Sequence, residues 1–105
     1  MALADEKLGD AAKASAPEIA QLTNQLNGWN IINDGMDKLE REYVFPTFKD
    51  ALTFVNKVGA VAEEQGHHPQ ITFTWGTATV RWWSHSLGGL TRNDFIMAAK
   101  TDLSV

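Results

Sequence analysis

The pattern of hydrophobic and polar positions along the chain predicts three helices and four strands. Apolar residues recur every three or four positions in the helical segments, and alternate with polar ones or form short β-branched and aromatic runs in the strand segments. The expected elements are a helix from Ser15 to Gly28, strands at Trp29–Asn33 and Lys38–Phe45, a helix from Thr47 to Gly66, strands at Gln70–Trp75 and Ala78–Ser84, and a helix opening at Thr91. The buried stripe expected on the second helix consists of Phe48, Leu52, Val55, Val58 and Ala62.

Turn signals join these strands into two hairpins. Asp34-Gly35 separates the first pair and Gly76-Thr77 the second, so we expect an antiparallel sheet. The predicted fold is α+β, with two layers: a four-stranded antiparallel sheet and helices packed on one face, in the order α-β-β-α-β-β-α. Residues 1–14 are expected to be a flexible N-terminal lead-in, and residues 15–105 a single domain.

Composition excludes several classes of protein. The 105 residues include no cysteine, which excludes a disulfide framework, a thiolate zinc site and a cysteine nucleophile. Nine basic against thirteen acidic residues give a net charge of −4, and without a basic cluster we expect no nucleic-acid partner. No apolar run approaches the roughly 20 residues of a membrane span. The first fourteen residues resemble no targeting peptide, so we expect a cytoplasmic protein with no membrane partner.

The register of the second hairpin predicts that the histidines of the chain meet. With Gly76-Thr77 as a two-residue loop, Phe73 lies opposite Val80, and His68 lies opposite His85 on the more polar face. The third histidine of the chain immediately precedes His68 at the exit of a helix. We therefore expect three imidazoles to line one solvent-reachable pocket.

Imidazoles suit proton transfer, because the ordinary histidine pKa of about 6.5 lies close to neutrality. Glu63, one helical turn before His67, and Asp94, at the start of the last helix, are expected at the rim of the pocket as orienting carboxylates. Each has a simpler interpretation, since Glu63 fits a solvated helix charge and Asp94 a helix-start residue. No metal site is expected, because His67 and His68 would have to diverge from one backbone to share an ion.

An ordered set of residues is similar to a known family. The set comprises Glu63, His67-His68-Pro69, Trp75, His85 and Asp94, accompanied by Gly28-Trp29, Phe48-Lys49-Asp50 and Gly89-Leu90-Thr91. In these residues the chain resembles the pterin-4a-carbinolamine dehydratases, also called dimerisation cofactors of a hepatocyte nuclear factor, over about residues 16–103. It departs from the pattern at Gly66, where some members carry an acidic residue, and at Ser86, which is often larger.

The resemblance implies a dehydratase that removes water from 4a-hydroxytetrahydropterin to give quinonoid dihydropterin in tetrahydropterin recycling, without a cofactor. It implies His67 and His85 as the acid–base pair, with His68 holding the pterin or sharing proton transfer. The implied substrate-binding residues are Glu63, Gly66, Pro69, Ser84, Ser86 and Asp94. The partners would be the pterin substrate, further copies in a homodimer or homotetramer, and a possible protein partner. The alternative is a non-catalytic assembly or dimerisation factor, or a pterin-binding module, of the same fold.

Overall fold

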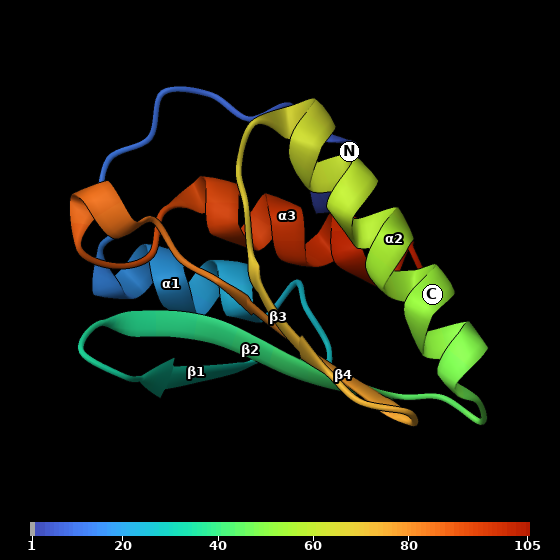
Figure 1. The fold of residues 1–105 in the computed structure, drawn as a ribbon. Coiled ribbons are helices and arrows are strands. Elements are labelled where there is room, and N and C mark those ends of the chain that lie inside the picture. The colour runs from blue at the N-terminus through green and yellow to red at the C-terminus, as the bar shows by residue number, and fades with distance from the viewer. Residues whose placement is uncertain (1) are drawn as a thin grey trace.

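The computed structural model describes residues 2–105 and has the α+β architecture expected from the sequence (Figure 1). Three α-helices and a four-stranded antiparallel sheet follow one another in the predicted order α-β-β-α-β-β-α, which is confirmed. The elements are the 3₁₀ turn η1 (Leu3–Asp5), α1 (Ala16–Thr23), β1 (Asn30–Asn33), β2 (Asp37–Val44), α2 (Phe48–Gln65), β3 (Gln70–Phe73), β4 (Thr77–Trp82), the 3₁₀ turn η2 (His85–Leu87) and α3 (Arg92–Asp102).

The sheet has the strand order β1-β2-β4-β3, and the three helices lie on one side of it (Figure 1). The central strand β4 alternates strictly between buried and partly exposed residues, as a half-covered strand does. Its buried members Ala78, Val80 and Trp82 face the helices and are 0% exposed. Phe54 of α2 and Phe95 of α3 belong to the same core, so the helical layer and the sheet share one hydrophobic interior.

Helix α2 carries the clearest local signals. The Thr47 side chain accepts a hydrogen bond from the Asp50 backbone N–H at 3.1 Å, which caps the helix start. Gly66 ends the helix in the left-handed conformation, with φ of 68°, that glycine adopts without steric cost. The expected buried stripe was only partly right. Val58 and Ala62 are buried together with Ala51 and Phe54, whereas the predicted Phe48 and Leu52 are 48% and 38% exposed.

The predicted register of the second hairpin is wrong by two residues. A hydrogen bond from the Thr74 N–H to the Thr77 carbonyl closes a loop of Trp75 and Gly76, so Phe73 pairs with Ala78 instead of Val80. Neither loop residue has a positive φ, which excludes the type I′ and II′ turns that are common in two-residue hairpin loops. The reason lies in the neighbouring strand, because Thr77 pairs with Val44 of β2 and is therefore part of the ladder. A shift of two preserves the two faces of the strands.

The N-terminal segment makes specific contacts with α3. Leu3 is buried in the core, and the Lys100 ammonium donates a hydrogen bond to the Ala4 carbonyl at 2.8 Å. Glu6 forms an ion pair with Arg92, whose hydrogen bonds lower the pKa of the Glu6 carboxyl below its ordinary value. The flexibility expected for residues 1–14 stays a prediction, and these are the contacts that movement of the segment would break. No helix within residues 2–105 is long and apolar enough to cross a membrane.

Candidate active site

One open pocket, with a volume of about 560 Å³, brings the three histidines of the chain together. It lies between the end of α2, the segment that follows β4, the start of α3 and the N-terminal segment. The residues that line it are Gly9, Asp10, Ala11, Gly66, His67, His68, Trp83, Ser84, His85, Ser86, Leu87, Thr91 and Asn93. A single surface therefore presents three imidazoles, an aromatic ring and several hydroxyl groups to a ligand.

His67 is held from two sides. The chain leaves α2 through Gly66, and the His67 backbone N–H donates to the Ala62 carbonyl at 3.2 Å. The imidazole stacks on the buried Trp82 ring, with centroids 5.5 Å apart and an interplanar angle of 24°. Its Nε2 lies 2.6 Å from Oδ1 of Asp94. Packing and a short hydrogen bond thus fix the orientation of this ring.

Asp94 is completely buried, so the expectation that it lies at the pocket rim is wrong. It belongs to the capping box of α3, in which its Oδ2 accepts the Thr91 backbone N–H at 2.9 Å. The same oxygen accepts the Ser84 hydroxyl at 2.9 Å, and that hydroxyl lies 3.0 Å from Oγ1 of Thr91. With Oδ2 saturated by these donors, Oδ1 is directed to His67. Asp94 is therefore the helix-start residue of α3 and also contacts His67, while its role as an orienting carboxylate stays a prediction.

The pairing of His67 with Asp94 distinguishes the two ring nitrogens. Oδ1 of the Asp94 carboxylate is an acceptor, so Nε2 of the neutral His67 imidazole carries the proton and donates to it. Nδ1 of the ring then keeps its lone pair. Within residues 2–105, every fully buried side-chain nitrogen or oxygen has a hydrogen-bond partner, and no hydrogen bond of these residues engages Nδ1 of His67. Nδ1 is therefore solvent-accessible, and it is the atom of His67 that can exchange a proton with a bound molecule.

His68 has a looser environment. Its Nε2 lies 3.2 Å from Oε2 of Glu63, and the two side chains are 62% and 82% exposed. Glu63 thus contacts His68 rather than His67, and it does not line the pocket. A solvent-exposed pair of this kind contributes little to stability. The His68 ring is therefore open to solvent and to a ligand in the pocket.

His85 reaches the pocket by a route that differs from the prediction. Strand β4 ends at Trp82, before His85, so His85 does not lie opposite His68 in the ladder. The chain instead closes on itself, with Ser84 bridged to Gly89, and η2 carries His85 in the resulting turn. Gly88, with φ of 73°, ends this turn in the left-handed region. The exposed His85 side chain consequently comes from a different wall of the pocket than the rings at the end of α2.

Some predicted residues lie in the pocket wall and others do not. Gly66, Ser84 and Ser86 line it, whereas Pro69 does not and Asp94 lies beneath it. Sequence reasoning missed further lining residues, namely Gly9, Asp10, Ala11, Leu87, Thr91 and Asn93. The Thr91–Asp94 capping box was a usable signal for Thr91, but the composition of the N-terminal segment gave none for its three residues.

The arrangement supplies groups for proton transfer. Imidazole groups can donate and accept protons around a ligand, and one of the three is paired with a buried carboxylate. Among residues 2–105 no group of three or more histidine, cysteine or carboxylate side chains is arranged to hold a metal ion. The expectation of a metal-free protein stays a prediction, to be tested by analysis of the purified protein.

Comparisons with known proteins identify the family of the chain. The family model described as pterin 4 alpha carbinolamine dehydratase matches residues 12–103. A protein of Syntrophotalea carbinolica that carries the provisional name pterin-4-alpha-carbinolamine dehydratase is 53% identical over 93 residues, which cover 88% of this chain and 83% of the relative.

Solved structures share the fold. The crystal structure of a transcriptional coactivator/pterin dehydratase from Brucella melitensis is similar with a TM-score of 0.81 and 27% identity, over 88% of this chain and 97% of that chain. A pterin dehydratase-like protein identified as a RuBisCO assembly factor in the alpha-carboxysome has a TM-score of 0.63 and 23% identity, over 74% and 89% of the two chains, which shows the fold alone. This chain belongs to the pterin 4 alpha carbinolamine dehydratase family.

Proposed function

We propose that the protein is a dehydratase that converts 4a-hydroxytetrahydropterin into quinonoid dihydropterin and water. The reaction breaks the bond between C4a and the hydroxyl oxygen, removes the proton from N5, and forms the double bond between C4a and N5. Hydroxide is a poor leaving group, so the oxygen must receive a proton as it departs while a base takes the N5 proton. The reaction therefore needs one acid and one base on the same ligand.

The observation that carries the proposal is the short contact between His67 and the buried Asp94, 2.6 Å from Nε2 to Oδ1. A carboxylate in this position stabilises the imidazolium that forms when Nδ1 accepts a proton. His67 is accordingly the base that takes the N5 proton. The hydrogen bonds that Ser84 and Thr91 donate to Oδ2 keep the carboxylate aimed at the ring.

His85 is the acid in this scheme. Its exposed imidazole lies on another wall of the pocket and equilibrates with solvent protons, so it can protonate the 4a-oxygen and be recharged after each turnover. The protonated 4a-hydroxyl group leaves as water, and the proton taken up by His67 then passes to solvent. His68, tied only to the exposed Glu63, holds the ring of the pterin. The hydroxyl proton of Ser84 is committed to Asp94, so Ser84 offers a ligand its oxygen as an acceptor.

The direct test is stopped-flow dehydration of chemically prepared 4a-hydroxytetrahydropterin. The wild-type protein should accelerate dehydration, and His67→Ala and His85→Ala should each lower the rate about 10²–10⁴-fold, the usual contribution of general acid–base catalysis. His68→Ala should weaken pterin binding at least as much as it slows turnover. Glu64→Gln, which removes an exposed carboxylate next to Glu63, is the control and should leave the rate unchanged.

Two outcomes would contradict the proposal. Full rates for both the His67 and His85 variants, with unchanged circular dichroism, would show that these rings do not carry the proton transfers. A folded wild-type protein that fails to accelerate dehydration would favour the non-catalytic role as an assembly or dimerisation factor. Binding of the pterin without turnover would instead identify a pterin-binding module.

A further inference from the structure

Part of the pocket wall comes from the N-terminal segment. Gly9, Asp10 and Ala11 line the same pocket as the three histidines, and they precede residues 12–103, the region that matches the family. We call residues 6–13 the N-terminal strap. In Figure 1 this blue segment runs from α1 past the end of α2 that leads into β3. The strap therefore gives this chain a pocket wall from outside the family-matched region.

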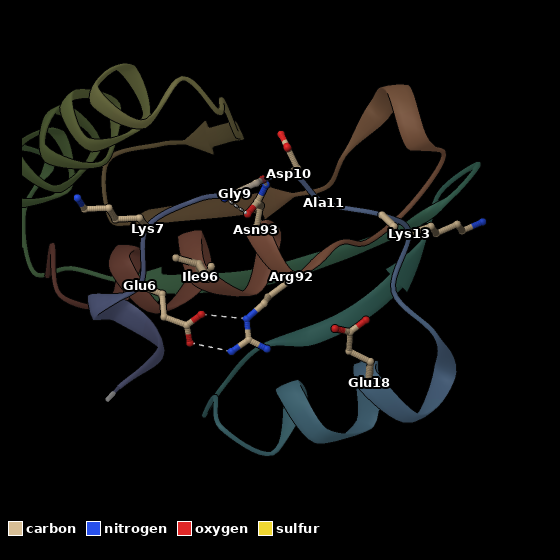
Figure 2. Close-up of a pocket in the computed structure, with 11 residues that line it drawn as sticks. Glu6, Lys7, Gly9, Asp10, Ala11, Lys13, Glu18, Arg92, Asn93 and Ile96 are labelled. Carbon is tan, nitrogen blue, oxygen red and sulfur yellow. Dashed lines mark hydrogen bonds and ion pairs between the residues drawn. The ribbon is translucent and has the colours of Figure 1, made fainter.

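The strap is fastened to the first two residues of α3, Arg92 and Asn93. Arg92 donates two hydrogen bonds to the Glu6 carboxylate, at 2.9 and 2.7 Å. The Asn93 side chain accepts the Gly9 N–H at 3.2 Å and donates to the Gly9 carbonyl at 2.8 Å (Figure 2). Beyond the strap, the Ala14 N–H donates to the Leu90 carbonyl at 2.8 Å. Both backbone polar groups of Gly9, the residue before Asp10, are thus hydrogen-bonded to Asn93.

Asp10 contributes a carboxylate to the pocket. Figure 2 shows its side chain pointing away from the Glu6–Arg92 pair. No other aspartate or glutamate lines the pocket within residues 2–105. Over the same residues its carboxylate forms no hydrogen bond or ion pair, and the residue is exposed. Both carboxylate oxygens are consequently available to a ligand, on a backbone that Asn93 already fixes.

We propose that Asp10 is a specificity-determining residue that binds the pyrimidine edge of the pterin. This inference rests on the proposed function. The 2-amino group and the adjacent ring N–H of a pterin form two parallel donors, which match the two oxygens of a carboxylate. Asp10 accepts both, and so directs the opposite part of the ring system, with C4a and N5, toward the imidazoles. Asn93 holds the strap at Gly9, the residue before Asp10.

The test measures the affinities of two ligands for the wild-type protein and for Asp10→Asn. The ligands are a stable pterin and the corresponding lumazine, in which an oxygen replaces the 2-amino group. Wild-type protein should bind the pterin about 10- to 100-fold more tightly, the range expected for charge-assisted hydrogen bonds. In Asp10→Asn this preference should fall below about twofold. The amide NH₂ can donate to the 2-oxo group of the lumazine, and the amide oxygen can accept from the 2-amino group of the pterin. Quenching of tryptophan fluorescence measures both affinities.

The control is Asp5→Asn, which removes an exposed carboxylate of η1 that does not line the pocket and should keep the wild-type preference. With 4a-hydroxytetrahydropterin, Asp10→Asn should raise KM about tenfold or more and change kcat less than about threefold. Wild-type activity with an unchanged KM and an unchanged preference in Asp10→Asn would refute this inference alone. A wild-type protein that neither binds nor dehydrates the pterin would refute the proposed function and this inference together.

Discussion

Replacing Asp94 with asparagine separates what this side chain does for the fold from what it does for His67. The amide keeps the volume of the carboxylate in a site that is 0% exposed. Its orientation is decided by Thr91, whose backbone N–H always donates and must meet the amide oxygen. The amide NH₂ then occupies the position of Oδ1 and faces Nε2 of His67. Two donors cannot face each other, so the imidazole must move its proton from Nε2 to Nδ1.

The structural cost of Asp94→Asn should be modest. The hydrogen bonds from Ser84 and Thr91 persist but lose their charge assistance, which lowers the free energy of unfolding by about 1–3 kcal/mol. The cost in catalysis should be larger, because the Nδ1 lone pair that takes up the proton is gone. The same substitution in a serine-protease triad lowers kcat about 10⁴-fold through the wrong tautomer. We expect a loss of about 10²–10⁴-fold in the dehydration rate.

Two measurements check this prediction together. Stopped-flow dehydration gives the rate, and ¹⁵N NMR of the imidazole distinguishes a proton on Nε2 from one on Nδ1. Glu64→Gln is the control, since it alters an exposed carboxylate of α2 that does not line the pocket and should leave the rate unchanged. A folded Asp94→Asn protein with the wild-type rate, or with the His67 proton still on Nε2, would refute the reasoning.

Three further outcomes are expected. Asp102→Ala removes the acceptor of Trp29, Arg41 and Tyr43, and it should lower the free energy of unfolding in urea by about 2–4 kcal/mol; a change below about 0.5 kcal/mol would contradict this. Burial and the Asp102 carboxylate raise the pKa of Tyr43. Its contribution to stability is therefore fully present below the ordinary tyrosine pKa of about 10 and is lost as the pH rises from there through the folded-state pKa; Tyr43→Phe should show a smaller alkaline loss, and an equal loss would exclude Tyr43 as the cause. Elemental analysis should find no stoichiometric zinc or iron, and chelators should leave the dehydration rate unchanged; one tightly held metal per chain would overturn this.

Local signals were enough to predict the elements of the fold. Capping by Thr47, the left-handed Gly66 and the Thr91–Asp94 capping box are decided within a few residues of sequence, and each is present in the structure. The alternation along β4 is likewise a local signal, and its buried members Val80 and Trp82 face the helices. These features depend on backbone geometry and burial that neighbouring residues determine.

Long-range contacts decided what the sequence could not predict. The hairpin loop shifted because Thr77 pairs with Val44, a partner on another hairpin that turn chemistry does not reveal. The three imidazoles share a pocket as expected, but His85 arrives on η2 rather than on a strand. The contribution of Asp10 depends on tertiary contacts between the N-terminal strap and α3, and no local periodicity encodes them. Contacts between segments that are far apart in the sequence therefore required the structure.

The pairing of β2 with β4 at the centre of the sheet has a consequence for the order of folding. Each hairpin can close locally. Leu39 of β2 and Trp82 of β4 pair only when the intervening segment, which contains α2 and β3, has folded back to bring the two strands together. Closing so long a segment costs chain entropy before any contact compensates it, so this central pairing is expected to limit the folding rate. Truncation of Leu39 should therefore slow refolding, whereas truncation of Ile71 on the edge strand β3 should mainly accelerate unfolding, a difference that chevron analysis can measure.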